Sequence, residues 1–336
     1  MKLGSRATDA GRAIPLTDPD SWSAALDGVP HAFAHTWANC RAMASATGSP
    51  TFLYATEQDG ERAVCAIAER TFQGTIDVVT PFGGAGFAAT GPMPDLLPAW
   101  RTFARERGWV CGYLQLHPVL ETPFASGPLG CGADKESFVL DLRQPASELE
   151  ARLAHGRRSA LRAWERGEGR FVDDRRRIEA FGTGELPRFT HLRGGAVFSV
   201  TPEAWGHILD QPGTIAFGVE AEGELVAINV IVRTATTADG LFLVSRPGHE
   251  QLSTALVWEG IRRLQRCGVA TLNLGAGVRA GDGVEAFKRS LGATPLPTRV
   301  LRQVYDEESF ARLCEQAGVD PDQREGHFPP YRRPVP

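Results

Sequence analysis

The feature that most constrains the fold is an internal repeat. Residues 57–70 read EQDGERAVCAIAER and residues 220–233 read EAEGELVAINVIVR, so the two stretches lie 163 positions apart. In each copy an apolar strand is followed by Asp-Gly or Glu-Gly and a second apolar strand, which is the pattern of a β-hairpin. The repeat therefore predicts two copies of one folding unit. The alternative is two unrelated α/β domains that share a common hairpin signal.

The elements expected after each hairpin agree in kind and order. In the first half they are a strand at 75–80, a glycine-rich loop at 82–87, a helix at 96–107 and a strand at 109–116. In the second half they are a strand at 241–245, a loop at 246–251, a helix at 252–267 and a strand at 270–275. Antiparallel strands followed by a helix and a returning strand are the layout of the acetyltransferase-like (GNAT) fold. We therefore predict an α/β (α+β) chain of tandem GNAT-like domains, each a mixed, mostly antiparallel sheet flanked by helices.

The same pattern suggests where the domains begin and end. We expect a first GNAT-like domain at 1–146 and a second, which carries the catalytic site, at 147–306. Residues 307–336 are expected to form a C-terminal helix and a proline-rich tail that packs back on the first domain. A single helix is predicted over 147–167, because its apolar residues fall on one side.

Composition places the chain among globular proteins. Apolar residues make up 42% and charged residues 23% of the 336 residues, which suits an enzyme with a sizeable core. The sequence has no apolar run of about 18 residues and no apolar signal segment at its start, so neither membrane insertion nor secretion is expected. The six cysteines form no Cys-x-x-Cys pair, which disfavours a metal site and fits a reducing cytoplasm. We expect a cytoplasmic monomer or weak dimer.

A local concentration of arginine stands out against the net charge of −4. Residues 152–177 hold nine arginines and four acidic residues, and Arg158, Arg162 and Arg166 share one helical face. Like charges at this spacing repel each other by roughly a few tenths of a kcal/mol per pair, and an anionic partner would remove that cost. Because the whole chain is mildly acidic, a polyanion must be held by a local patch of this kind. A solvated arginine-rich face is the alternative.

The second candidate site is the stretch VATLNLGAGVRAGDGVEAFKRSL at 269–291. A strand that includes Asn273 runs into a loop with Gly275 and Gly277, and a short helix with Phe287 and Lys288 follows. Glycines let backbone N–H groups approach a ligand, and the N-terminus of a helix favours an anion. Only three of the 36 basic residues are lysines, a bias typical of a high-GC bacterial genome, so a lysine in this motif is unexpected. Its compact charge could meet a phosphate or a developing oxyanion. A flexible turn with a surface lysine is the alternative.

The third candidate is the loop TPFGGAGFAATGP at 80–92, in which Phe82 and Gly83 could form a pocket wall. The loop matches neither a P-loop nor a dinucleotide fingerprint, and a turn-rich connection is the alternative. No Gly-x-Ser-x-Gly elbow, His-Glu-x-x-His motif or zinc-ligand spacing occurs, so we expect no metal and no cofactor. His117 and His191 are possible bases, or structural histidines.

The usual cofactor of the GNAT fold lacks its sequence signal. Members that bind acetyl-CoA carry an Arg/Gln-x-x-Gly-x-Gly/Ala loop between the fourth strand and the next helix, and its amides cradle the pyrophosphate. Here the junction reads SRPGHEQLSTAL from Ser245. Arg246 and Gly248 are present, but the spacing differs and the second small residue is missing. This disfavours an ordinary acetyltransferase.

Together these motifs resemble the Fem family of aminoacyl-tRNA-dependent transferases. The resemblance is carried by Thr80–Phe87, Ser137–Gly167 and Leu272–Ala293. It implies two GNAT-like domains and amide-bond formation in peptidoglycan cross-bridges or in natural products such as antibiotics. It also implies that Lys288 lies at the reaction centre, where it contacts the donor or its phosphate. The arginines of the second stretch resemble the basic segment of the family.

The resemblance thus implies an acyltransferase that moves an aminoacyl group from aminoacyl-tRNA to an amine acceptor, either a natural-product intermediate or a cell-wall precursor. The catalytic candidate is Lys288. The candidates for substrate binding are Phe287, Asn273, Gly275, Gly277, Arg246, Phe82 and Gly83. The candidates for binding tRNA or phosphate are Arg157, Arg158, Arg162 and Arg166. Two alternatives stay open: an acyl-CoA-dependent N-acyltransferase that acts on a small amine, and a non-catalytic binding protein.

Overall fold

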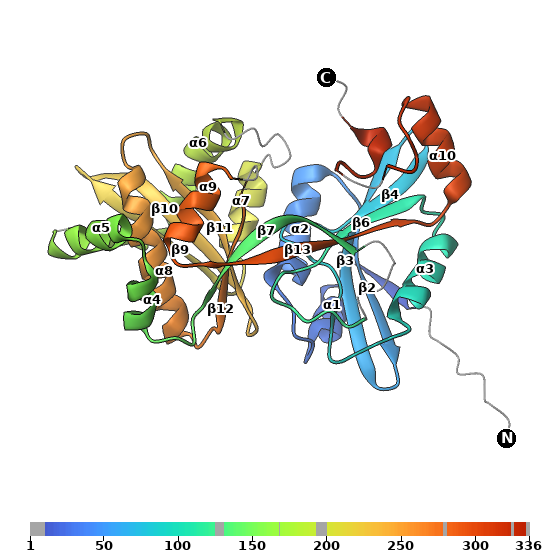
Figure 1. The fold of residues 1–336 in the computed structure, drawn as a ribbon, viewed down its shortest axis with the longest axis horizontal. Helices are drawn as coiled ribbons and strands as arrows, with labels where there is room; N and C mark the ends of the chain where they lie inside the picture. Colours follow the sequence, from blue (N-terminus) through green and yellow to red (C-terminus); the bar gives the residue numbers. More distant parts are fainter. Residues whose placement is uncertain are drawn as a thin grey trace. The chain divides into compact units, whose positions relative to one another are not determined.

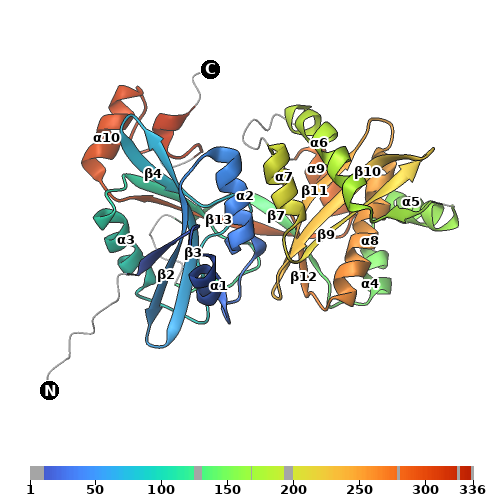
Figure 2. The ribbon, with the colours of Figure 1, turned by 180° about the vertical axis from the view of Figure 1, so that it is seen from behind.

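The computed structural model of the chain divides into two compact units (Figures 1 and 2). It describes residues 11–124, 131–167, 169–192, 200–277, 281–323 and 326–333. Unit 1 comprises Met1–Ala44, Gly48–Asp134 and Arg299–Pro336, and unit 2 comprises Ser45–Thr47 and Lys135–Thr298. Each unit is built from a mixed sheet and helices that pack on it, as predicted for the GNAT-like fold.

Unit 1 contains a six-stranded path in the order β1-β2-β3-β4-β6-β13. The strands that come from the first part of the sequence are β1 (Arg12–Pro15), β2 (Thr51–Gln58), β3 (Glu61–Phe72), β4 (Thr75–Val79), β5 (Ala88–Ala89) and β6 (Cys111–Gln115). Its helices are α1 (Pro19–Leu26), η1 (Phe33–His35), α2 (Trp37–Thr47), α3 (Leu96–Glu106), α10 (Glu307–Gln316) and η3 (Pro330–Arg332).

Unit 2 contains the path β13-β7-β12-β11-β10-β9-β8. Its strands are β7 (Cys131–Asp141), β8 (Phe171–Val172), β9 (Thr214–Ala221), β10 (Glu224–Arg233), β11 (Ala238–Ser245) and β12 (Thr271–Ala276). Strand β13 spans Thr294–Val304, and its residues up to Thr298 belong to this unit. Its helices are α4 (Ala146–Arg152), α5 (His155–Arg166), α6 (Arg175–Leu192), α7 (Pro202–Leu209), η2 (Glu250–Leu252), α8 (Ser253–Arg266) and α9 (Gly283–Ser290).

The two predicted hairpins are confirmed, and they are built alike. Strands β2 and β3 pair antiparallel in unit 1, as β9 and β10 do in unit 2. Both turns place a non-glycine residue and then a glycine at positive φ: Asp59 at 52° and Gly60 at 86°, Glu222 at 52° and Gly223 at 82°. Two successive residues at positive φ make the type I′ turn, whose twist matches that of the flanking strands. The spacing of 163 residues therefore repeats a backbone conformation as well as a sequence pattern.

Each sheet includes a strand that lies far from its sheet neighbours in the sequence. Strand β7 follows β6 in the chain, yet it pairs antiparallel with β12 of unit 2. Strand β13 follows β12 and α9 in the chain, yet from Val300 to Val304 it pairs antiparallel with β6 of unit 1. Parallel pairs β4–β6 and β11–β12 precede these positions in the two sheets. The repeats thus share one topology and exchange one strand.

The prediction of a single helix over 147–167 was wrong. The structure has two helices, α4 and α5, and Leu153 and Ala154 between them are extended, with ψ values of 138° and 151°. The N–H of Ala154 donates to the carbonyl of Ser290 at 2.9 Å, at the end of α9. A tertiary hydrogen bond therefore replaces a helical one at this position, which the apolar periodicity of the segment does not reveal.

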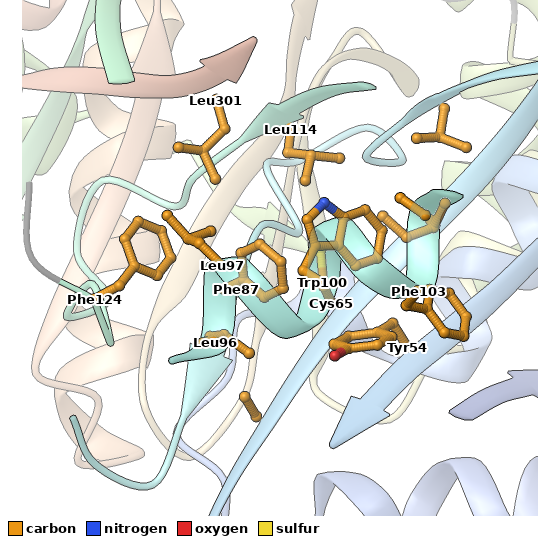
Figure 3. Close-up of a cluster of buried hydrophobic side chains, with 14 of the residues drawn as sticks. Tyr54, Cys65, Phe87, Leu96, Leu97, Trp100, Phe103, Leu114, Phe124 and Leu301 are labelled. Carbon is orange, nitrogen blue, oxygen red and sulfur yellow. The ribbon is translucent and has the colours of Figure 1, made fainter. Parts of the chain in front are cut away.

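The core of unit 1 is centred on Trp100 of α3 (Figure 3). Its ring lies 5.0 Å from that of Tyr54 and 5.5 Å from that of Phe87, both edge-to-face. Its indole N–H lies 2.9 Å from the Tyr305 hydroxyl and 3.0 Å from the Gln303 amide oxygen. Gln303 belongs to β13, so the exchanged strand is fixed to this core by hydrogen bonds as well as by its pairing with β6.

The C-terminal segment also packs within unit 1. Phe328 and Tyr331 are buried against Phe310 of α10 and Cys111 of β6. The guanidinium of Arg332 lies 2.5 Å from the carboxylate of Asp77, a residue that is 1% exposed. In the described parts of the chain, no helix is long and apolar enough to cross a membrane.

A buried histidine makes the stability of unit 1 dependent on pH. His35 is fully buried, with its ring nitrogens 2.7 Å from the Gly86 carbonyl and 3.2 Å from the Ala32 carbonyl. Burial lowers the pKa of His35 from 6.5 to about 4. Protonation therefore favours the unfolded chain, and the contribution of the neutral ring is complete above pH 6.5 and is lost as the pH falls towards 4.

We expect the free energy of unfolding to fall by about 3 kcal/mol over this range because of His35. In the variant His35→Gln, which cannot be protonated, denaturant unfolding at pH 7.5 and 4.5 should show a correspondingly smaller difference. An unchanged difference between the two pH values would contradict the assignment.

Candidate functional site

The candidate site begins at an irregularity in β12. Asn273 pairs with Val139 of β7, but the next pair is Ala276 with Ser137, so β12 has one residue more than β7 between the two pairs. This is a β-bulge, and Gly275 in it has a φ of 72°. Glycine adopts this left-handed conformation without the steric cost that a Cβ brings. The N–H of Gly275 donates to the side-chain oxygen of Asn273 at 2.9 Å.

The predicted short helix after the glycine-rich loop is confirmed as α9. The carboxylate of Asp282 caps its N-terminus, where it accepts from the N–H of Glu285 at 2.8 Å. The loop residues 278–280 lie outside the described residues. Helix α9 carries Phe287 and Lys288 in its second turn, as expected.

Lys288 lies against the bulge. Its ammonium donates to the carbonyl of Ala276 at 2.7 Å and is partly buried. A Cβ placed on Gly275 would lie 3.7 Å from the lysine Nζ, in ordinary contact. The structure therefore brings Lys288, Asn273 and Gly275 together, with Gly277 following directly after the bonded carbonyl. The side chain is held by the backbone of β12, unlike a surface lysine on a flexible turn.

Arg157 is also attached to α9. Its guanidinium carbon lies 4.7 Å from the centre of the Phe287 ring. Its Nε donates to the Ser290 hydroxyl at 2.9 Å, and its Nη1 donates to Thr254 of α8 at 3.4 Å. Phe287 also packs against the hydrophobic core of unit 2. Arg157 thus fixes the helix that carries the lysine.

The other three predicted phosphate-binding arginines of α5 are placed differently. Arg158 donates to the carbonyl of Ala151 in α4 at 3.0 Å. Arg162 lies 3.9 Å from the carboxylate of Glu150, also in α4, and is 63% exposed. Arg166 is exposed in the last turn of α5. These three residues share a helical face that does not include Arg157. The basic segment therefore has one arginine that points towards α9 and three outward arginines on the shared face.

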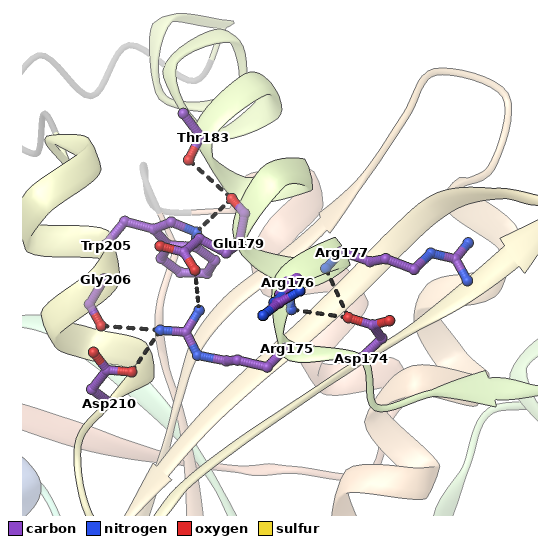
Figure 4. A network of polar contacts seen from close by, with 9 residues as sticks. All are labelled: Asp174, Arg175, Arg176, Arg177, Glu179, Thr183, Trp205, Gly206 and Asp210. Carbon is purple, nitrogen blue, oxygen red and sulfur yellow. Dashed lines mark hydrogen bonds and ion pairs between the residues drawn. The ribbon is translucent and has the colours of Figure 1, made fainter.

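The arginines further along the same stretch stabilise the start of α6 (Figure 4). Arg175 donates to Glu179 at 2.9 Å and to Asp210 at 2.7 Å, and so connects α6 to the end of α7. The N–H groups of Arg176 and Arg177 donate to the carboxylate of Asp174, at 3.0 and 3.1 Å. The local excess of positive charge seen in the sequence is therefore partly balanced by ion pairs.

Arg246 is engaged by two carboxylates. Its Nε donates to Glu185 of α6 at 3.2 Å, and its Nη1 lies 3.6 Å from Glu224 of β10. The guanidinium carbon is 5.5 Å from the centre of the Phe181 ring. The contacts of Arg246 are thus with α6 and β10, and its charge is compensated at the junction where acetyl-CoA-binding members hold a pyrophosphate.

Phe82 and Gly83 belong to unit 1, whereas the other predicted site residues belong to unit 2. The Phe82 ring is 44% exposed, and its carbonyl accepts from the Asn39 side chain at 3.4 Å. Gly83 has a φ of 108°, and a Cβ there would lie 2.9 Å from the Ala34 side chain. The loop is therefore held in place around an exposed aromatic ring.

The sequence did not single out Asp239, which the structure places next to Asn273. Asp239 is 6% exposed, and its Oδ1 accepts from the Asn273 amide at 2.8 Å. The strand was predicted from 241, whereas β11 starts at Ala238, so the aspartate fell outside it. If the strand had been predicted to start at Ala238, an aspartate inside a buried strand would have marked Asp239 as a candidate site residue.

Of the two candidate histidines, the structure describes the side chain of His117. His117 is 2% exposed in unit 1, and its Nδ1 accepts from the N–H of Val119 at 3.4 Å, which fits a structural role. The side chain of His191 lies outside the described residues. Within the residues that the structure covers, no group of three His, Cys, Asp or Glu side chains could hold a metal ion.

Comparisons with known proteins identify the fold. No protein-family model matches the chain, and no curated protein matches its sequence. The crystal structure of FemX has a TM-score of 0.68 at 10% identity, over 90% of this chain and 99% of that one. A conserved protein of unknown function from Bacteroides thetaiotaomicron VPI-5482 has a TM-score of 0.60 at 11% identity, over 88% and 99%. L-PGS from Bacillus licheniformis has a TM-score of 0.55 at 14% identity, over 86% and 92%. Identities this low establish the fold alone: the chain, with its two units, has a FemX-like fold.

Proposed function

We propose that the protein is an aminoacyltransferase that forms an amide bond between the aminoacyl group of an aminoacyl-tRNA and an amine acceptor. The observation that carries the proposal is the ammonium of Lys288, held at the Ala276 carbonyl beside the bulge of β12. The FemX-like fold also supports it. The sequence resemblance to the Fem family implies that this lysine lies at the reaction centre.

The reaction requires positioning and charge stabilisation more than strong activation. An aminoacyl-tRNA is an ester, and the acceptor nitrogen attacks its carbonyl carbon. A C–N bond forms, the C–O bond to the ribose breaks, and the proton of the amine passes to the ribose oxygen. Lys288 stabilises the negative charge on the carbonyl oxygen, or holds the terminal phosphate of the donor. A tRNA hydroxyl or the substrate itself carries the proton.

The other site residues bind the aminoacyl end and the acceptor stem of the donor tRNA. The backbone from Gly275 to Gly277 lies beside the lysine and meets the aminoacyl end, and Phe287 precedes the lysine on α9. The outward face of Arg158, Arg162 and Arg166 meets phosphates of the acceptor stem. The exposed ring of Phe82, with Gly83, is a substrate contact in unit 1.

The environment of Arg246 favours tRNA over CoA as the donor. Two carboxylates, from Glu185 and Glu224, lie next to its guanidinium. They would repel the pyrophosphate of CoA at the junction where the GNAT fold usually binds it. Arg246 then contributes to substrate binding together with the neighbouring Phe181 ring and the two carboxylates. The acceptor is a natural-product intermediate or a cell-wall precursor with a free amine.

The donor can be identified directly. The protein is incubated in parallel with a set of charged tRNAs and a set of acyl-CoAs, each with a panel of amines. We expect deacylation of one aminoacyl-tRNA that depends on the amine, and no consumption of acyl-CoA. Consumption of acyl-CoA with all charged tRNAs intact would replace the proposal by the acyl-CoA-dependent alternative.

The role of the lysine is tested by Lys288→Met. Removal of a charge that meets a developing oxyanion typically costs about 10²–10³ in kcat, and we expect a loss of this size in amine-dependent deacylation. Lys135→Met is the matched control, because Lys135 is exposed on β7 and the chemical change is the same. Transfer by folded Lys288→Met at the rate of the control would end the assignment.

The outward arginines predict a salt dependence. If Arg158, Arg162 and Arg166 contact phosphates, replacing all three by Gln should reduce the slope of log K against log salt by about 2 to 3. The control triple, Arg12, Arg41 and Arg312 to Gln, removes the same charge from exposed positions of unit 1 and should leave the slope unchanged. Equal slopes for the two triples, measured by tRNA binding, would leave the arginines of α5 as ordinary surface.

A further inference from the structure

Two polar side chains are buried side by side on the neighbouring strands β11 and β12, close to the bulge that holds Lys288. Asp239 of β11 and Asn273 of β12 are register partners in the parallel pair, and they are 6% and 7% exposed. A buried carboxylate is costly unless a donor meets it. Here the amide nitrogen of Asn273 donates to Oδ1 of Asp239 at 2.8 Å.

This bond fixes which way the Asn273 amide points. The amide nitrogen is the donor in this bond, so the NH₂ group faces Asp239 and the amide oxygen faces away. That oxygen accepts from the N–H of Gly275 at 2.9 Å. A flipped amide would set two acceptors against each other on one side and two donors on the other.

The orientation of the Asn273 amide affects the position of the Lys288 ammonium through the bulge. The bond to the N–H of Gly275 holds this residue in its left-handed conformation, and the next residue, Ala276, presents its carbonyl to the ammonium of Lys288 at 2.7 Å. We infer that Asp239 and Asn273 are positioning residues that set the location of the Lys288 ammonium through the Gly275–Ala276 bulge. They contact the backbone beside the lysine and not the reacting atoms.

The functional meaning of this relay rests on the proposed function. A charge that stabilises a transition state must be kept within a fraction of an ångström of its productive place, and residues behind it provide that rigidity. The geometric claim itself, that the amide sets the place of the ammonium, can be tested without any activity.

The scarcity of lysine makes the geometric test direct. Lys2, Lys135 and Lys288 are the only lysines of the chain, so reductive methylation with ¹³C-formaldehyde gives three lysine NMR signals and one from the N-terminus. The variant Lys288→Arg assigns the signal of Lys288. In Asn273→Ala this signal should move towards the random-coil position, while those of the other lysines stay.

The matched control is Asn229→Ala. Asn229 is a second buried asparagine of unit 2, 4% exposed, and its amide donates to the Leu256 carbonyl at 3.1 Å. Its removal leaves a comparable buried gap on β10, away from the bulge, and the Lys288 signal should stay in place. A Lys288 signal that moves equally in both variants, or in neither, would overturn the inference.

The contribution of Asp239 is tested by a pair of variants. Asp239→Ala removes the acceptor and should shift the Lys288 signal in the same direction as Asn273→Ala. Asp239→Asn keeps an acceptor oxygen at this position and should restore the signal most of the way. If Asn273→Ala does not fold, Gly275→Ala is the substitute, because a residue with a Cβ resists the φ of 72° and should displace the same signal.

Kinetics separate this inference from the proposed function. In Asn273→Ala we expect kcat for transfer to fall at least about tenfold with KM changed by less than about twofold, as for loss of transition-state positioning. A moved Lys288 signal with unchanged kcat would support the positioning and contradict the catalytic role of the lysine. An unmoved signal with reduced kcat would overturn the positioning and leave the proposed function standing.

Discussion

The one extra residue in β12 is the constraint on which the candidate site depends. It breaks the regular pairing with β7 between Asn273 and Ala276, so that a backbone carbonyl turns to the side and accepts from a lysine that arrives from the next helix. Gly275 in the bulge has a φ of 72°, and the carbonyl of the next residue, Ala276, accepts from the Lys288 ammonium.

The two repeats differ at this point. In unit 1 the corresponding strand β6 pairs with β13 over five consecutive residues without a shift of register. Gly112, 163 positions before Gly275, has the hydroxyl of Tyr305 where a Cβ would lie. The same small residue thus serves close packing in one copy and a left-handed bulge in the other. The duplication provides the scaffold twice, and the irregularity that can carry chemistry occurs in unit 2.

Local patterns predicted the local parts of the structure. Both hairpins, helix α8 and the short helix with Lys288 follow from turn residues and apolar spacing, and those signals act over a few residues. The break at Leu153–Ala154 was missed because a hydrogen bond to Ser290, distant in sequence, decides it. Asp239 was missed because the start of its strand was placed three residues too late, and its partner is 34 residues away.

The exchange of β7 and β13 has no local signature either. The segment 135–141 has the composition of a strand that could complete the first sheet, and the choice of the second sheet is made by pairing and packing over the whole chain. The site residues were found by their types, since a lysine is rare here and glycines cluster. Their mutual arrangement, including the split between Arg157 and the outward arginines of α5, required the structure.

The exchanged strand also has a consequence for how the protein is made. The N-terminal unit cannot complete its sheet until β13, whose pairing with β6 ends at Val304, has left the ribosome. Until then β6 presents an open edge, which nascent chains must keep from pairing with other molecules. Folding of the first-made half therefore waits for β13, the last strand among the described residues, and synthesis of the two halves as separate polypeptides would leave each sheet one strand short.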